Sequence, residues 1–133
     1  MGQQQLLLIV LGVIIVGIAV VVGINVFTAS SANANRDAVI SDLTTLAAMA
    51  QQYYRKPVAM GGGGNTFNGG TAAWDVPPSL DTTANGVYTR TAIAANQVTL
   101  QGVGNEYGNN GTSGVQVTMV VGRNKIETTT INN

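Results

Sequence analysis

Residues 5–27 read QLLLIVLGVIIVGIAVVVGINVF, and this stretch decides the fold. From Leu6 to Ile24 the chain is an unbroken apolar run of nineteen residues, which is long enough to cross the hydrocarbon core of a bilayer. The first thirty-five residues contain no ionisable side chain. Because a helix of this composition is apolar on every face, the sequence predicts that the segment lies in lipid or inside protein.

The helical pattern continues beyond the apolar run instead of ending in a basic cluster. Residues 28–35 are small or polar, and after them Val39, Leu43 and Leu46 recur at a spacing of three to four and form one apolar stripe. We expect the helix to end just before Pro57, because proline disfavours helical geometry in the residue that precedes it. The sequence therefore predicts one helix of about fifty-five residues, roughly 80 Å long, whose apolar front half projects.

The chain after the helix reads as a loop followed by strands. Clusters of glycine and proline within 57–86, including Gly61–Gly64, predict an irregular connecting loop, which we expect Phe67 and Trp74 to anchor on the core. The glycine run lacks the Lys-Ser/Thr pair of a phosphate-binding loop, so it is interpreted as a flexible loop.

Alternating apolar residues then indicate strands. Val115, Val117, Met119 and Val121 alternate with Gln116, Thr118 and Val120, which is the period of a half-buried strand. Weaker strand patterns cover 87–93, 97–103 and 125–131, and an exposed loop is predicted over 104–114. These segments predict an antiparallel meander of three or four strands, covered on one face by the stripe of Val39, Leu43 and Leu46.

The predicted fold class is α+β, with a long N-terminal helix packed on a small antiparallel sheet. Four segments follow from this interpretation: the apolar helix half 1–27, the amphipathic helix half 28–56, the connecting loop 57–86 and the β-meander 87–133.

Composition argues against several classes of function. Charged residues are 9% of the chain, with six acidic and six basic, so no basic cluster exists for nucleic acid. The chain has no His and no Cys, which argues against zinc, iron–sulfur and thiol chemistry, and no metal or cofactor is expected. No pair of carboxylates can be placed together from spacing, and no His is available as a base, so an enzyme is rejected. A surface rich in uncharged polar residues suits a subunit that packs against copies of itself.

The layout resembles that of type IV pilins and pseudopilins, which have a long N-terminal helix, a glycine-rich connection and an antiparallel sheet. The start of the chain also resembles a mature pilin. Met1 takes the place of the family's first hydrophobic residue, Gln5 falls where the family has its glutamate, and Leu6–Val10 continue the aliphatic run. No proline marks the family's helix-breaking region, where Gly17 and Gly23 stand instead.

The resemblance implies a structural subunit that polymerises through its apolar helix into an extracellular pilus-like filament. The implied partners are further copies of the chain, the membrane that holds the precursor, and a pilus-type assembly machinery, with no nucleic acid. The residues expected at the assembly interface are Met1, Gln5, Leu6, Leu7, Ile9, Val10, Gly12, Ile14, Gly17, Ala19 and Gly23. The segment from Gly17 to Gly23 is expected to unwind on polymerisation, because glycine has a low helix propensity.

Other interpretations remain open at this point. The apolar run also fits the signal anchor of a single-pass protein, although the basic flank that normally sets orientation is missing. A pseudopilin-like component of a secretion apparatus, or a single-pass surface-binding module, is the alternative function. Gln5 is expected to hydrogen-bond a neighbour's amino terminus, or else Gln3–Gln5 form the solvated start of a membrane span.

Two smaller features of the sequence are interpreted conservatively. Asn110-Gly111-Thr112 is a glycosylation sequon on a predicted loop, and chance is the simpler explanation in a chain rich in Asn and Thr. The aromatic residues are predicted to anchor the core rather than to stack along a fibre; they include Phe27, Tyr53, Tyr54 and Trp74.

Overall fold

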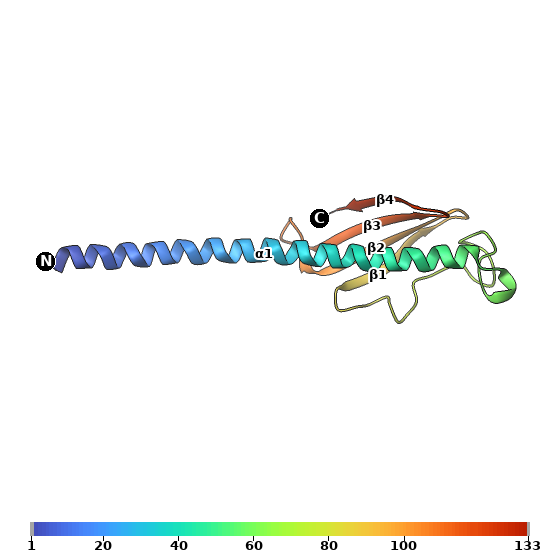
Figure 1. Ribbon diagram of the computed structural model, residues 1–133, viewed down its shortest axis with the longest axis horizontal. Coiled ribbons are helices and arrows are strands. Elements are labelled where there is room, and N and C mark those ends of the chain that lie inside the picture. The colour runs from blue at the N-terminus through green and yellow to red at the C-terminus, as the bar shows by residue number, and fades with distance from the viewer. Residues whose placement is uncertain (1, 133) are drawn as a thin grey trace. The chain divides into compact units, whose positions relative to one another are not determined.

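The computed structural model describes residues 2–132 and contains one long helix and one four-stranded antiparallel sheet (Figure 1). Helix α1 spans Gly2–Arg55, the short 3-10 helix η1 spans Val58–Met60, and the strands are β1 (Gly86–Ile93), β2 (Gln97–Tyr107), β3 (Gly114–Gly122) and β4 (Ile126–Ile131). The strand order β1-β2-β3-β4 means that each strand pairs with its neighbour in the chain. The predicted α+β class and the antiparallel meander are therefore confirmed.

The chain divides between Ser31 and Ala32 into two compact units. The second unit, called the head below, holds the whole hydrophobic core. Its helical stripe of Val39, Leu43 and Leu46 is buried, with exposed fractions of 0%, 0% and 2%. The side chains that the sheet contributes to the same core are Tyr88, Val98, Leu100, Val115, Val117, Met119 and Val121. The alternation along β3 thus places one face of the sheet against α1.

Close approach of helix and sheet depends on one glycine. A Cβ on Gly102 would come within 2.7 Å of Val39 Cγ1 and 3.0 Å of the Tyr88 ring. Any larger residue at this position of β2 would separate the helix from the sheet, because a packed interior has no free volume to absorb it.

The glycine-rich segment after α1 caps the helix. The N–H of Gly63 donates to the carbonyl oxygen of Tyr53 at 2.8 Å. The N–H of Asn65 donates to the carbonyl oxygen of Tyr54, also at 2.8 Å. A Cβ on Gly63 would overlap the Thr66 carbonyl oxygen and lie 2.7 Å from the Tyr53 ring. The run therefore satisfies helix carbonyls that would otherwise lack partners, which a freely flexible loop would not do.

The prediction that aromatic residues anchor the core is confirmed for Phe67 and Trp74 of the head, and it is wrong for Phe27. Phe67 and Trp74 are buried at 0% and 6% exposure, and the Phe67 ring lies 4.9 Å from the ring of Tyr54. Phe27 is 74% exposed, because it belongs to the first unit and has no core to enter.

Strand β2 is longer than the sequence predicted. Residues 104–107 were expected in a loop but continue the strand, so the connection to β3 is only 108–113. Gly104 pairs with Gly86, and the N–H of Glu106 donates to Asn35 Oδ1 at 3.3 Å. The side chain of Asn35 in α1 thus holds the end of β2, although residues 104–107 have no apolar alternation that would predict a strand.

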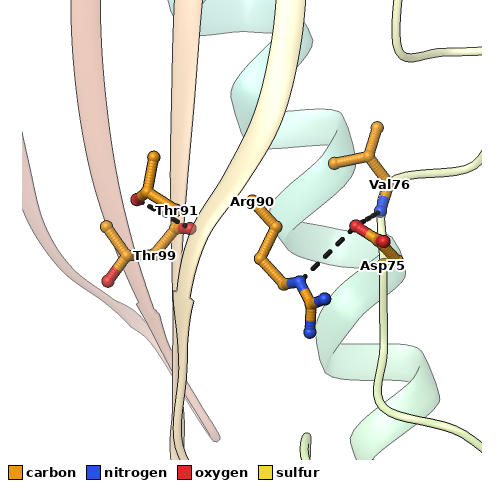
Figure 2. Close-up of polar contacts among 5 residues, drawn as sticks. All are labelled: Asp75, Val76, Arg90, Thr91 and Thr99. Carbon is orange, nitrogen blue, oxygen red and sulfur yellow. Dashed lines mark hydrogen bonds and ion pairs between the residues drawn. The ribbon is translucent and has the colours of Figure 1, made fainter.

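The loop before β1 runs along the outer edge of that strand. The N–H of Tyr88 donates to the carbonyl oxygen of Asp81 at 2.7 Å. Farther along, Arg90 Nε lies 3.5 Å from Asp75 Oδ1, as Figure 2 shows, and the same oxygen accepts the N–H of Val76. This edge of the sheet is therefore covered by the chain's own loop.

Asp42 is the carboxylate that joins the helix to this loop and to β1. Its Oδ2 accepts hydrogen bonds from the Tyr88 hydroxyl at 2.6 Å, from Asn85 Nδ2 at 2.9 Å and from Thr83 Oγ1 at 3.1 Å. Burial by itself raises the pKa of Asp42, but the three hydrogen bonds outweigh it and hold the pKa below its ordinary value of 3.8. Burial, with the hydrogen bond to Asp42 and its negative charge, raises the pKa of Tyr88 above its ordinary value of 10.0.

We expect this contact to make the head's folding stability depend on pH at both extremes. The pKa of Asp42 is lowered on folding, so its stabilisation is present above 3.8 and is lost as pH falls through the lowered pKa. The pKa of Tyr88 is raised on folding, so its stabilisation is present below 10.0 and is lost as pH rises toward the raised pKa. Tyr88→Phe should lower the free energy of unfolding by about 1–2 kcal/mol near neutral pH. It should also reduce the loss of stability at both acidic and alkaline pH. Urea unfolding across the pH range tests this, and an unchanged profile in the variant would contradict it.

Candidate assembly surface

The first unit is a helix with no core of its own. Every residue from Gly2 to Ser30 is helical and exposed. The seventeen large apolar side chains between Leu6 and Phe27 have exposed fractions from 51% to 74%. The helix is long and apolar enough to span a membrane, judged by length and composition.

This apolar surface is too large to stay in water. The largest apolar patch on a typical soluble monomer covers about 300–600 Å², whereas seventeen exposed aliphatic and aromatic side chains present roughly 1,000 Å² or more. We therefore expect lipid or other protein to cover the segment.

All the predicted assembly residues that the structure describes lie on this exposed part of α1. They are Gln5, Leu6, Leu7, Ile9, Val10, Gly12, Ile14, Gly17, Ala19 and Gly23. Met1 lies outside the described residues. The segment from Gly17 to Gly23 is regular α-helix in the single chain, and its unwinding on polymerisation stays a prediction.

The helical period places four of the polar and small residues among them on one side of α1. Gln5, Gly12 and Ala19 follow one another at intervals of seven, and Gly23 comes four residues later, so all four share one side of α1. Gly17 lies on the opposite side. Sequence reasoning missed that Gln5 shares its side with small residues, although the heptad spacing is a signal that could have revealed it.

The chain itself gives no reason for glycine at three of these positions. A Cβ placed on Gly12, Gly17 or Gly23 would meet nothing within 4 Å, in contrast to Gly63 and Gly102 of the head. Each glycine costs a helix roughly 1 kcal/mol relative to alanine. A neighbour that packs close to the helix backbone would supply the missing reason.

Comparison with known proteins found no matching family model, no matching curated protein and no matching solved structure. Within residues 2–132, no group of three or more His, Cys, Asp and Glu side chains is placed to hold a metal ion.

Proposed function

We propose that this chain is a pilin-like structural subunit that polymerises through the apolar part of α1 into an extracellular filament. The partner of the helix is the same helix in further copies, and a membrane holds the subunit before a pilus-type machinery assembles it. The observation that carries the proposal is the uncovered apolar segment of α1, which belongs to the same helix that packs on a head with a complete core of its own.

Burial supplies the driving force. If roughly 1,000 Å² of apolar surface leaves water, a coefficient of about 25 cal/mol per Å² corresponds to tens of kcal/mol before the costs of association are subtracted. When the helix leaves lipid rather than water, the gain in free energy is far smaller, because lipid tails are as apolar as the helix. Close packing between the helices must then supply that gain. This difference allows a membrane-held subunit to be extracted and added to a polymer.

The side of α1 that carries Gln5, Gly12 and Ala19 fits a close helix–helix contact. Small residues let two helix backbones approach, so the Gln5 amide comes within reach of a neighbour's polar groups. An amide both donates and accepts without carrying charge, so it costs less to bury than a carboxylate. Gln5 is therefore assigned a hydrogen bond to an adjacent subunit.

Gln5→Leu should slow filament growth or weaken filaments by a few-fold, corresponding to roughly 1 kcal/mol per subunit contact, because interhelical hydrogen bonds in membranes have about this strength. Gln3→Leu is the matched control, since it makes the same change on another side of the first turns. Assembly rates and the denaturant concentration that dissolves filaments measure the effect. Equal behaviour of both variants and the wild type would exclude the Gln5 contact.

The function itself is tested on material sheared from the surface of cells that produce the chain. Negative-stain microscopy should show filaments, and mass spectrometry should identify this chain as their main component. Recovery of the chain only from the membrane fraction, in low amount, would favour a pseudopilin-like component or a single-pass surface-binding module instead.

A further inference from the structure

The charged side chains of the head are separated by sign between its two ends. All six acidic and all six basic side chains of the chain lie in the head. Arg90 Nε lies 3.5 Å from Asp75 Oδ1, so these two charges offset each other. Two groups remain, called the positive end and the negative end below: Arg55, Lys56, Arg123, Lys125 and Glu127 where α1 finishes, and Arg36, Asp37, Asp42, Asp81 and Glu106 in the half toward Ala32.

The positive end is formed by the end of α1 and by the turn between β3 and β4. Gln51 Nε2 donates to the carbonyl oxygen of Gly122 at 3.2 Å, which joins the last turns of α1 to the end of β3. Arg55 follows Gln51 by about one helical turn and lies on the same side of α1. Arg123 and Lys125 follow Gly122 in the turn, which Figure 1 shows at the same end of the head as the C-terminal end of α1. Four basic groups and one acidic group therefore gather here, with a formal charge of +3.

The negative end is formed by the first turns of the head's helix and by the segments beside them. The N–H of Glu106 donates to Asn35 Oδ1 at 3.3 Å, and Asp37 comes two residues after Asn35. Asp42 and Asp81 both accept hydrogen bonds from the same residue of β1. Four acidic groups and one basic group give this end a formal charge of −3.

The two ends lie far apart in one head. Asp37 precedes Arg55 by five helical turns, so the two lie on the same line of α1 and roughly 27 Å apart. This separation is several times the screening length of about 8 Å at physiological ionic strength. The two ends of one head therefore do not neutralise each other.

Both ends are accessible to a neighbour. The exposed charged side chains include Asp37, Asp81 and Glu106 at the negative end and Arg55, Lys56, Arg123 and Lys125 at the positive end. None of these four basic side chains forms an ion pair with a residue between 2 and 132. The helix dipole accounts for basic residues at the end of α1, but not for those in the turn between β3 and β4. Contacts within the head therefore leave a net positive charge at this end.

We propose that the positive end of one head binds the negative end of the next head along the filament. The proposal rests on the proposed filament function. Copies that repeat along a filament point the same way, so that unlike ends face each other. A contact of this head-to-tail kind joins two different surfaces and continues from copy to copy without closing. A second copy of the chain supplies the opposite charge in equal amount, −3 against +3.

The strength of this contact is limited, because water and salt screen exposed ion pairs. Burial of the apolar part of α1 remains the driving force of polymerisation, and the end-to-end contact fixes how successive heads are placed. Isolated heads should therefore stay monomeric in dilute solution. In the full chain, the contact should make assembly depend on salt.

Removal of charge from one end tests the contact. Arg123→Gln with Lys125→Gln removes two positive charges from the positive end. Thr44→Glu with Ala48→Glu is the matched control, because it makes the same change in net charge at exposed positions of α1 midway between Asp37 and Arg55. The measured quantity is the lowest concentration of full-length subunit that forms filaments when detergent is removed.

The Gln variant should need roughly five-fold more subunit than the wild type at low salt, whereas the control should assemble like the wild type. This difference should disappear in about 1 M salt, where the screening length is only about 3 Å. An effect of net charge alone would instead be the same in both variants.

Charge reversal shows which surfaces meet. Arg123→Glu with Lys125→Glu makes both ends negative, and Asp37→Lys with Glu106→Lys makes both ends positive. Each of these variants alone should assemble more poorly than the wild type at low salt, because like charges meet at every contact. An equal mixture should assemble again into filaments that contain both chains, since each end then finds an opposite charge on the other variant. Recovery in the mixture also shows that both variants are folded.

Three results would overturn the proposal. Equal assembly of the Gln variant and its matched control, or no recovery in the mixture, would exclude the end-to-end contact and leave the filament function intact. Wild-type filaments that bind anionic lipid vesicles through Arg123 and Lys125, with assembly unchanged in the Gln variant, would assign the positive end to an anionic surface instead. A complete absence of wild-type filaments would overturn the proposed function and this contact with it.

Discussion

Deletion of residues 1 to 27 is expected to leave a soluble, monomeric head that forms no filaments. All buried core residues lie between Ala32 and Val121, so the deletion removes no core contact. It does remove every one of the seventeen exposed apolar side chains of the first unit, which supply the proposed polymer contact.

Sedimentation of the fragment in dilute solution measures its mass, and circular dichroism reports whether the sheet folds. Dilution matters because a protein with no net charge associates weakly at high concentration. The full-length chain under the same assembly conditions is the control. Well-ordered filaments of the fragment would show that the heads alone drive assembly, and the helix-based mechanism proposed here would be wrong.

Leu43→Asp is expected to unfold the head. Leu43 is completely buried between α1 and the sheet, with an exposed fraction of 0%. An unpaired buried carboxylate costs several kcal/mol, which is a large part of the roughly 5–15 kcal/mol that stabilises a typical domain. The neighbouring Asp42 carries a lowered pKa and is therefore charged at neutral pH, which adds repulsion.

Thr44→Asp is the matched control for this substitution. Thr44 is the next residue of the same helix and is exposed, so the same charge there stays in water and should change stability by less than about 0.5 kcal/mol. Circular dichroism and protease resistance compare the two variants. A folded Leu43→Asp head would show that the helix stripe does not hold the sheet.

The exposed apolar segment of α1 could be predicted from the sequence because it is a property of one helix. An unbroken apolar run defines the element. The fixed helical period also places Gln5, Gly12 and Ala19 on one side, a relation that the sequence-based prediction did not use. The same local periodicity predicted the helix end near Pro57 and the half-buried β3. Such features depend on residues close together in the chain, so no knowledge of distant contacts is needed.

Polar and glycine residues of the head acquired their roles only through the tertiary structure. The sequence contains Asn35, Asp42 and Gly63 but does not indicate the groups that they bind. Those hydrogen-bond partners lie in other segments of the head, which only the folded chain brings close. A hydrogen bond depends on the position of both groups, and spacing along the chain does not give the distance between residues that are far apart in sequence.

The sequence by itself therefore determined the helix, the order of the strands and the apolar surface, because local period and composition are sufficient for these. Only the tertiary structure decided how β2 extends to Tyr107, how the glycine run caps α1 and how Asp42 reaches Tyr88 of β1. Each of these follows from the register between strands and from contacts across the core, where a shift of one residue would reverse the face on which a side chain lies.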